Sequence, residues 1–155
     1  MTPQEQKERV EQAAANFKNG MNCSQSVVTA FADLYDIPQE TALKMSSSFG
    51  GGIGRMRLTC GAACGLFMLA GLEKAGATPN DTKARSENYK LVQEFSDKFT
   101  KRCGSICCAD LLGLNPKTLI VSTPEERTEE YYKKRPCGEI VAEAAAIFAE
   151  HLNKQ

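Results

Sequence analysis

The sequence predicts an all-α protein, a helical bundle of about five to six helices around a central apolar helix. Three observations support this class. Apolar residues recur at spacings of three and four along most of the chain, capping residues precede several of these stretches, and strand-like alternation is almost missing. With 155 residues and 42% hydrophobic content, the chain is long enough to build one core. We therefore expect residues 1–155 to form a single domain.

The first predicted helix carries its own start signal. Thr2 can cap it, Pro3 suits the first helical position, and Glu5 stands three residues after Thr2, where it completes a capping box. Gly20 ends the helix. Its expected apolar face consists of Val10, Ala13, Ala14 and Phe17.

Two further helices are predicted in the first third of the chain. Asn22 can cap a helix over 24–36, and Pro38 opens another over 39–49. Residues 50–54 include four glycines, each costing about 1 kcal/mol in a helix relative to alanine, so they form a loop. The apolar face of the helix over 24–36 is expected to contain Val27, Ala30, Phe31 and Leu34.

The second half contains the predicted central helix. Residues 61–74 are apolar on nearly every side, so other helices should surround them. A helix over 81–103 follows, then a linker over 113–124, a charged and helix-compatible segment over 125–134 that we expect to be a solvated arm, and a last helix over 138–152. The face expected to be buried on the helix over 81–103 is Tyr89, Val92, Phe95 and Phe99. On the last helix it is Ile140, Val141, Ala144, Ile147, Phe148 and Leu152.

Composition and charge exclude several function classes. Basic and acidic residues both number 19, so no cationic field would attract nucleic acid or anionic lipid. The longest apolar run, 62–72, is far shorter than the roughly 20 residues that a bilayer crossing needs, so we expect no membrane insertion. The polar N-terminus lacks the apolar segment of a secretory signal, and we expect a reducing, cytoplasmic location.

Cysteine is the main chemical feature of the sequence. In a reducing compartment, a set of cysteines is more typical of metal, iron–sulfur or thiol redox chemistry than of structural disulfides. Several of them precede or begin predicted helices, where free backbone N–H groups favour a thiolate. His151 is the only histidine, which excludes sites built from several histidines, and we expect it to be exposed. The seven cysteines are Cys23, Cys60, Cys64, Cys103, Cys107, Cys108 and Cys137.

The spacing of the cysteines differs from that of common small motifs. Cys60 and Cys64 are four residues apart, as are Cys103 and Cys107, which would place each pair on one face of a helix. Zinc knuckles and thioredoxin-like sites use a C-x-x-C pattern instead, and ferredoxins use a closely spaced run. A zinc ribbon and a ferredoxin are therefore disfavoured, and Cys64 can also be a small core residue.

Glycines and arginines lie beside these cysteines in the sequence. The loop over 50–54 matches no nucleotide-binding motif, so it is either a tight turn between helices or a place where the backbone approaches something bulky. Gly61 and Gly65, four residues apart, would let either a neighbouring helix or a cofactor come close. Arg55 and Arg57 are either ordinary surface residues or a source of positive potential near Cys60.

Taken together, these segments resemble the C_GCAxxG_C_C family. The segments that carry the resemblance are Asn22-Cys23-Ser-Gln-Ser-Val, Ser-Phe-Gly-Gly-Gly-Ile-Gly-Arg-Met, Cys60-Gly61-Ala62-Ala63-Cys64-Gly65, Cys108-Ala-Asp-Leu-Leu-Gly113 and Cys137. The family comprises redox-active proteins with four characteristic cysteines and a CGAxxG motif, and a related domain occurs in split-Soret cytochrome c. The resemblance spans nearly the whole chain.

The resemblance also implies which residues form the site. It assigns four cysteines as cofactor-binding residues and metal ligands, with two glycines of the motif beside them, and leaves Cys64, Cys103 and Cys107 as additional thiols. The implied site consists of Cys23, Cys60, Cys108, Cys137, Gly61 and Gly65.

Three functions are compatible with these residues. The first is an iron–sulfur protein that transfers electrons to a redox partner protein or senses redox state. The second is a thiol–disulfide protein that cycles pairs such as Cys60 with Cys64 or Cys107 with Cys108. The third is a structural helical protein with a zinc site. A homodimer is a further expectation, since Cys60 and the apolar helix could form an interface; whether the protein is an enzyme stays open.

Overall fold

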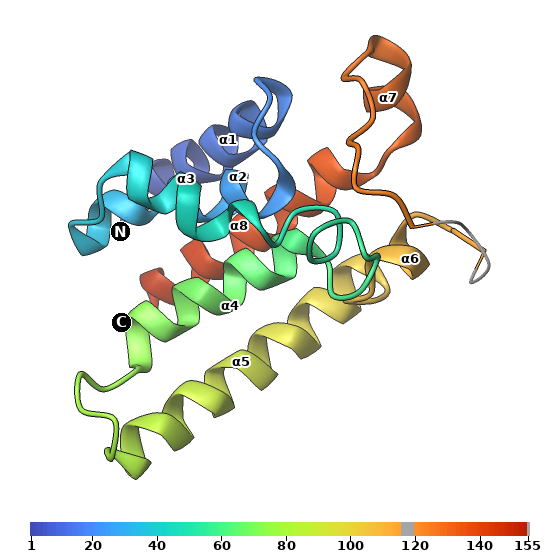
Figure 1. Ribbon diagram of the computed structural model, residues 1–155. Coiled ribbons are helices and arrows are strands. Elements are labelled where there is room, and N and C mark those ends of the chain that lie inside the picture. The colour runs from blue at the N-terminus through green and yellow to red at the C-terminus, as the bar shows by residue number, and fades with distance from the viewer. Residues whose placement is uncertain (116–119, 155) are drawn as a thin grey trace.

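The computed structural model describes residues 1–115 and 120–154, and within them it confirms the predicted all-α class. This part of the chain contains eight α-helices, one short 3-10 helix and no β-strand (Figure 1). Residues 116–119 of the predicted linker lie outside the described residues, as does Gln155. The α-helices are α1 (Pro3–Lys18), α2 (Cys23–Thr29), α3 (Gln39–Ser47), α4 (Gly61–Lys74), α5 (Thr82–Cys103), α6 (Cys108–Leu111), α7 (Glu129–Lys134) and α8 (Cys137–Asn153).

Side-chain caps set the starts of the first two helices. The predicted capping box between Thr2 and Glu5 begins α1, and a second one between Asn22 and Gln25 begins α2. The helix predicted over 24–36 is too long, because α2 ends at Thr29 and the 3-10 helix over Ala32–Tyr35 follows it. The chain therefore leaves α2 in a tight turn before it reaches α3.

The helices pack around one main hydrophobic core. In Figure 1, α4 lies between α5 on one side and α2 with α3 on the other, and α1 runs along α8. Phe148 of α8 contacts two other buried rings edge to face, Phe31 at 4.9 Å and Phe95 at 6.1 Å between centroids. Among the described residues, no helix is both long and apolar enough to cross a membrane.

Three predicted side-chain positions are wrong. Leu34, expected in the core, is 43% exposed on the 3-10 helix. Tyr89 is 58% exposed, because the buried face of α5 runs through Leu91 and Phe95, which are four residues apart. His151, expected to be exposed, is partly buried, with its ring centroid 5.3 Å from that of Phe95.

The charged segment over 125–134 is not a freely solvated arm. Part of it forms α7, whose Tyr131 and Tyr132 are partly buried against the main core. The Arg127 guanidinium lies 4.5 Å from the Phe17 ring centroid and 5.0 Å from that of Tyr131. These contacts fasten the segment to the end of α1.

Candidate functional site

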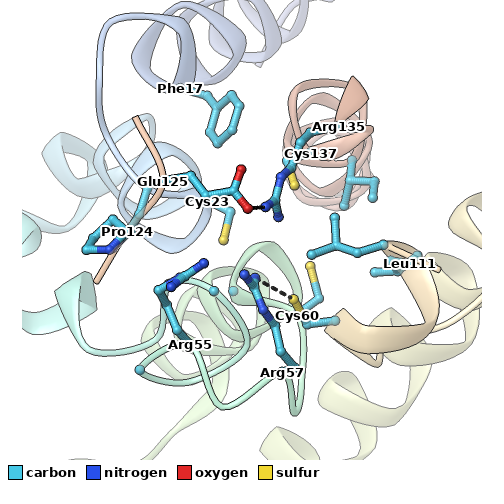
Figure 2. Close-up of a pocket in the computed structure, with 18 of the residues that line it drawn as sticks. Phe17, Cys23, Arg55, Arg57, Cys60, Leu111, Pro124, Glu125, Arg135 and Cys137 are labelled. Atoms are coloured by element: carbon cyan, nitrogen blue, oxygen red, sulfur yellow. Dashed lines mark hydrogen bonds and ion pairs between the residues drawn. The ribbon is translucent and has the colours of Figure 1, made fainter. Parts of the chain in front are cut away.

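Four of the seven cysteines line a single cavity of about 470 Å³. They come from distant parts of the sequence, and they are the four that the family resemblance singles out: Cys23, Cys60, Cys108 and Cys137. Figure 2 shows this cavity with Cys23, Cys60 and Cys137 labelled among the residues around it. The other three thiols are not among the described residues that line it.

Each of these four cysteines stands at the beginning of a helix. Cys60 is the N-cap of α4, and the other three are the first residues of α2, α6 and α8. The sequence indicated three of these helix starts but not the one at Cys108, because α6 is only four residues long. At the longer helices α4 and α8, the free N–H groups and the helix macrodipole favour negative charge near the sulfur.

A short backbone ladder brings Cys60 and Cys108 together. The Cys60 N–H donates to the Ile106 carbonyl and the Cys108 N–H donates to the Leu58 carbonyl, both at 2.6 Å. Side chains alternate along extended backbone, so Cys107, which forms the β-bridge between these bonds, faces the opposite way. This alternation explains why only one of the two adjacent cysteines lines the cavity.

The glycine-rich loop before this ladder is a left-handed turn. Residues 51–55 all have positive φ, between 59° and 77°, and so does Arg57. The N–H groups of residues 53–58 donate back to carbonyls of residues 48–53, which holds the loop in this shape. A non-glycine residue such as Ile53, Arg55 or Arg57 costs on the order of 1 kcal/mol in this conformation. This strained backbone lies at the cavity wall, since both Arg55 and Arg57 line the cavity.

The two glycines of the CGAxxG motif have different roles. A Cβ on Gly61 would lie 2.4 Å from the Cys23 Sγ, so Gly61 leaves room for that sulfur. A Cβ on Gly65 would lie 3.0 Å from a backbone oxygen of α2 and 3.1 Å from the Val27 Cβ. Gly61 therefore shapes the cavity, whereas Gly65 lets α2 and α4 pack closely.

The loop glycines also approach this site closely. A Cβ on Gly52 would lie 2.5 Å from the Cys108 Cβ, and one on Gly50 would lie 2.4 Å from the Asn22 side-chain nitrogen. The structure therefore shows both features that the sequence offered as alternatives, a tight turn between α3 and α4 and a close approach of the backbone, here to Cys108 and Asn22.

Among the residues that the structure describes, four arginines and one carboxylate, Glu125, line the cavity. Arg57 donates from Nη1 to the Cys108 Sγ at 3.6 Å, and Arg135 forms an ion pair with Glu125. Figure 2 shows Arg55 and Arg57 side by side on one wall, opposite the Glu125–Arg135 pair. For Arg55 and Arg57 the sequence was compatible with either ordinary surface residues or a source of positive potential near Cys60; both line the cavity that contains Cys60.

Two of these four arginines lie in a segment whose sequence pattern contains no indication of a site. Arg127 and Arg135 reach the cavity from the charged segment around α7, which was expected to be solvated. Arg127 donates to the carbonyls of Phe17 and Met21, more than a hundred residues away in the sequence. Local pattern gives no signal for contacts at such a separation.

Burial raises the pKa of three of the cavity thiols, and that of Cys137 reaches about 11. For Cys60 and Cys137 the neighbouring Cys23 raises the pKa further, because two thiolates would repel each other. For Cys108 the hydrogen bond and charge of Arg57 oppose the effect of burial. A bound cation would add a much larger opposing effect, since a metal deprotonates the thiols that bind it.

The remaining three cysteines lie elsewhere. Cys64 is buried in α4, and its Sγ donates to the Thr59 carbonyl at 3.8 Å. Neither four-residue spacing falls within one helix, because Cys60 is the N-cap that precedes α4 and Gly104 ends α5 directly after Cys103. The expected same-face pairs are therefore absent.

The four cavity thiols face a shared space. All seven cysteines are free thiols. Across residues 1–115 and 120–154, no three His, Cys, Asp or Glu side chains are grouped closely enough to hold a single metal ion. What the structure presents is a set of four separate sulfurs facing one cavity.

Comparison with known proteins identifies one relationship. The chain matches the sequence model of a family described as "Putative redox-active protein (C_GCAxxG_C_C)" over residues 21–151. All four cavity cysteines and the left-handed loop fall within the matched residues. No curated protein and no solved structure matches the chain.

Proposed function

We propose that this chain, which belongs to the C_GCAxxG_C_C family of redox-active proteins, binds an iron–sulfur cluster and acts in electron transfer or redox sensing. The ligands would be Cys23, Cys60, Cys108 and Cys137. The observation that carries the proposal is their meeting at one cavity from four separate helix starts. Iron–sulfur clusters are typically held by four cysteine thiolates, and bound here the cluster would supply one-electron transfer.

The size of the cavity between the thiols favours a cluster over a single ion. A tetrahedral zinc ion forms Zn–S bonds of about 2.3 Å and draws its sulfurs close together. A cluster places several atoms between its ligand thiolates, so these stand further apart. Four thiols around a cavity of about 470 Å³ fit the second arrangement better.

The charges around the cavity support the same assignment. Thiolates on a cluster carry negative charge into a partly buried site, where compensating charge is required. Arg57 contacts the Cys108 sulfur, and Arg55 lines the cavity beside it. Hydrogen bonds to ligand sulfur also help to set the reduction potential of a cluster. Arg57 is thus placed to influence that potential.

The chain's own packing limits access of water to the thiols. Cys60 is 6% exposed and Cys108 is 7% exposed, so both are nearly closed off by neighbouring residues. Ser122, Pro124 and Glu125 also line the cavity. Arg55 holds this segment, because it donates from Nη1 to the Val121 carbonyl at 3.0 Å and to that of Thr123. Shielding of this kind protects oxidation-sensitive sulfur.

The decisive experiment is purification without oxygen, followed by measurement of iron, acid-labile sulfide and visible absorbance. We expect a brown protein that contains iron and sulfide. Serine substitution of any one cavity cysteine should release the iron, because a four-thiolate site loses a ligand. A colourless protein with only zinc, or one whose thiols cycle through disulfides, would contradict the proposal.

Adjacent cysteines provide the matched control. Cys107→Ser and Cys108→Ser alter neighbouring residues, yet only Cys108 faces the cavity. We expect Cys108→Ser to lose iron and Cys107→Ser to keep it, as should Cys64→Ser and Cys103→Ser. The reverse result for the adjacent pair would show that the ligand set is wrong.

A further inference from the structure

Positive charge is concentrated on the cavity wall, although the chain as a whole has no net charge. Two of the four lining arginines have structural partners. Arg135 pairs with Glu125, and Arg127 donates to the Phe17 and Met21 carbonyls, both at 3.1 Å. These two guanidiniums fix the segment around α7 in place.

Arg55 and Arg57 are in a different situation. Neither forms an ion pair with a carboxylate in the part of the chain that the structure describes. Arg55 donates to the carbonyls of Val121 and Thr123, and Arg57 donates to the Cys108 Sγ. These acceptors are uncharged, so no ion pair neutralises either guanidinium, although the charge of Glu125 acts on Arg55 from a distance. Each guanidinium carries five N–H donors.

The backbone of the loop holds both arginines in a fixed left-handed conformation. Both have a φ of 60°, a conformation that glycine adopts far more easily than arginine. Their N–H groups donate to the carbonyls of Gly50 at 3.2 Å and Gly51 at 3.3 Å, which fixes the backbone beneath each side chain. Burial, and then the neighbouring charge of Arg57, lower the pKa of Arg55. An anion between the two side chains would relieve that repulsion.

We propose that Arg55 and Arg57 form a binding subsite for a small oxyanion, of the carboxylate or phosphate class, beside the four thiols. The planar guanidinium fork matches the paired oxygens of such groups. The cavity volume of about 470 Å³ lies within the usual range for small-molecule sites. Anion binding at this subsite does not depend on the proposed function. Identifying the anion as a redox substrate does rest on the proposed function.

The test is calorimetric titration with two probes, inorganic phosphate and malonate, at an ionic strength kept constant with chloride. We expect saturable binding at one site, weakened at least tenfold by Arg55→Gln and by Arg57→Gln. Arg102→Gln is the matched control, since Arg102 pairs with Glu143 and Glu150 on the surface away from the cavity. Arg55→Lys and Arg57→Lys keep the positive charge but lose the guanidinium fork, so we expect them to bind the anion with intermediate affinity. If a glutamine variant does not fold, these lysine variants provide the test.

The titration is run on protein purified without oxygen and again after removal of iron by a chelator. Arginine-dependent binding in both samples supports the subsite, and it does so even if no iron is found and the proposed function fails. Binding only after iron removal would overturn the inference, because the arginines would then serve only to balance the charge of the cluster. Binding that does not saturate, or that is equal in Arg57→Gln and the parent protein, would also overturn it.

Discussion

The sulfur of Cys23 lies against the backbone of Gly61, in the space that a side chain at that position would need. A Cβ on residue 61 would be 2.4 Å from the Cys23 Sγ and 2.7 Å from the Phe49 carbonyl oxygen. Cβ atoms do not approach other atoms so closely, so one of the groups would have to move. Cys23 of α2 can therefore occupy its position only because residue 61, the first glycine of the CGAxxG motif, has no side chain.

Gly61→Ala should displace Cys23 from the cavity. We expect the iron content of protein purified without oxygen to fall sharply, because one of four proposed ligands is moved, while circular dichroism stays helical. The control is Gly71→Ala in the same helix, where a Cβ meets no atom within 4 Å. That substitution should keep the iron and stabilise the fold by about 0.5–1 kcal/mol, since alanine favours helix more than glycine. Equal iron content in both variants would contradict the role given to Gly61.

Phe148 should be among the most important core residues for stability. It is fully buried and contacts the rings of Phe31 and Phe95. We expect Phe148→Ala to lower the free energy of unfolding by about 3–5 kcal/mol in urea titrations of iron-free, reduced protein. Tyr89→Ala, on the exposed face of α5, should change it by less than about 0.5 kcal/mol. Similar losses of stability for the two variants would contradict the burial of Phe148 and the exposure of Tyr89 described above.

Arg127 should control the mobility of the segment around α7. Its guanidinium lies over the Phe17 and Tyr131 rings and donates to the Met21 carbonyl. In Arg127→Gln these contacts are lost, and we expect faster amide hydrogen exchange in residues 128–135. Helix α5 should be unaffected and serves as the internal reference. Unchanged exchange in residues 128–135 would show that the aromatic contacts alone hold the segment.

Much of the fold could be predicted from local pattern because its signals are local. A capping box involves residues three apart, so Thr2 and Asn22 mark their helices in the sequence itself. The apolar helix over 61–74 has the predicted bounds, since it contains the longest apolar run of the chain, residues 62–72. Choosing the buried face of α5 was harder. Leu91 and Tyr89 both fit an apolar stripe, and only tertiary packing buries one of them.

The candidate site depends on contacts that local pattern does not contain. Cysteine spacing favoured the pair Cys60 and Cys64, yet the structure places Cys60 with Cys108, through a backbone ladder between segments far apart in the sequence. The family resemblance, not periodicity, singled out the four cysteines that meet. Arg127 and Arg135 carried no such signal, because their place at the cavity follows from the packing of α7.

His151 provides a prediction about pH. Its imidazole lies edge to face with Phe95, at 5.3 Å between centroids, and stacks near Phe148 at 6.3 Å. Burial beside these rings is the main reason that the pKa of His151 falls below its ordinary value of 6.5.

The surrounding charges act in both directions: Glu73 and Glu94 raise the pKa of His151, whereas Lys74 and Lys98 lower it. Because the folded protein binds the proton less readily than the unfolded chain, His151 has no effect on stability well above pH 6.5, where it is neutral in both states. As the pH falls below 6.5, the unfolded chain takes up the proton first, and stability is lost until the folded pKa is passed. Urea titrations of iron-free protein from about pH 8 to about pH 5 should therefore show a steeper loss of stability than in His151→Gln. Parallel pH profiles for the two proteins would show that His151 is accessible enough to be protonated without cost.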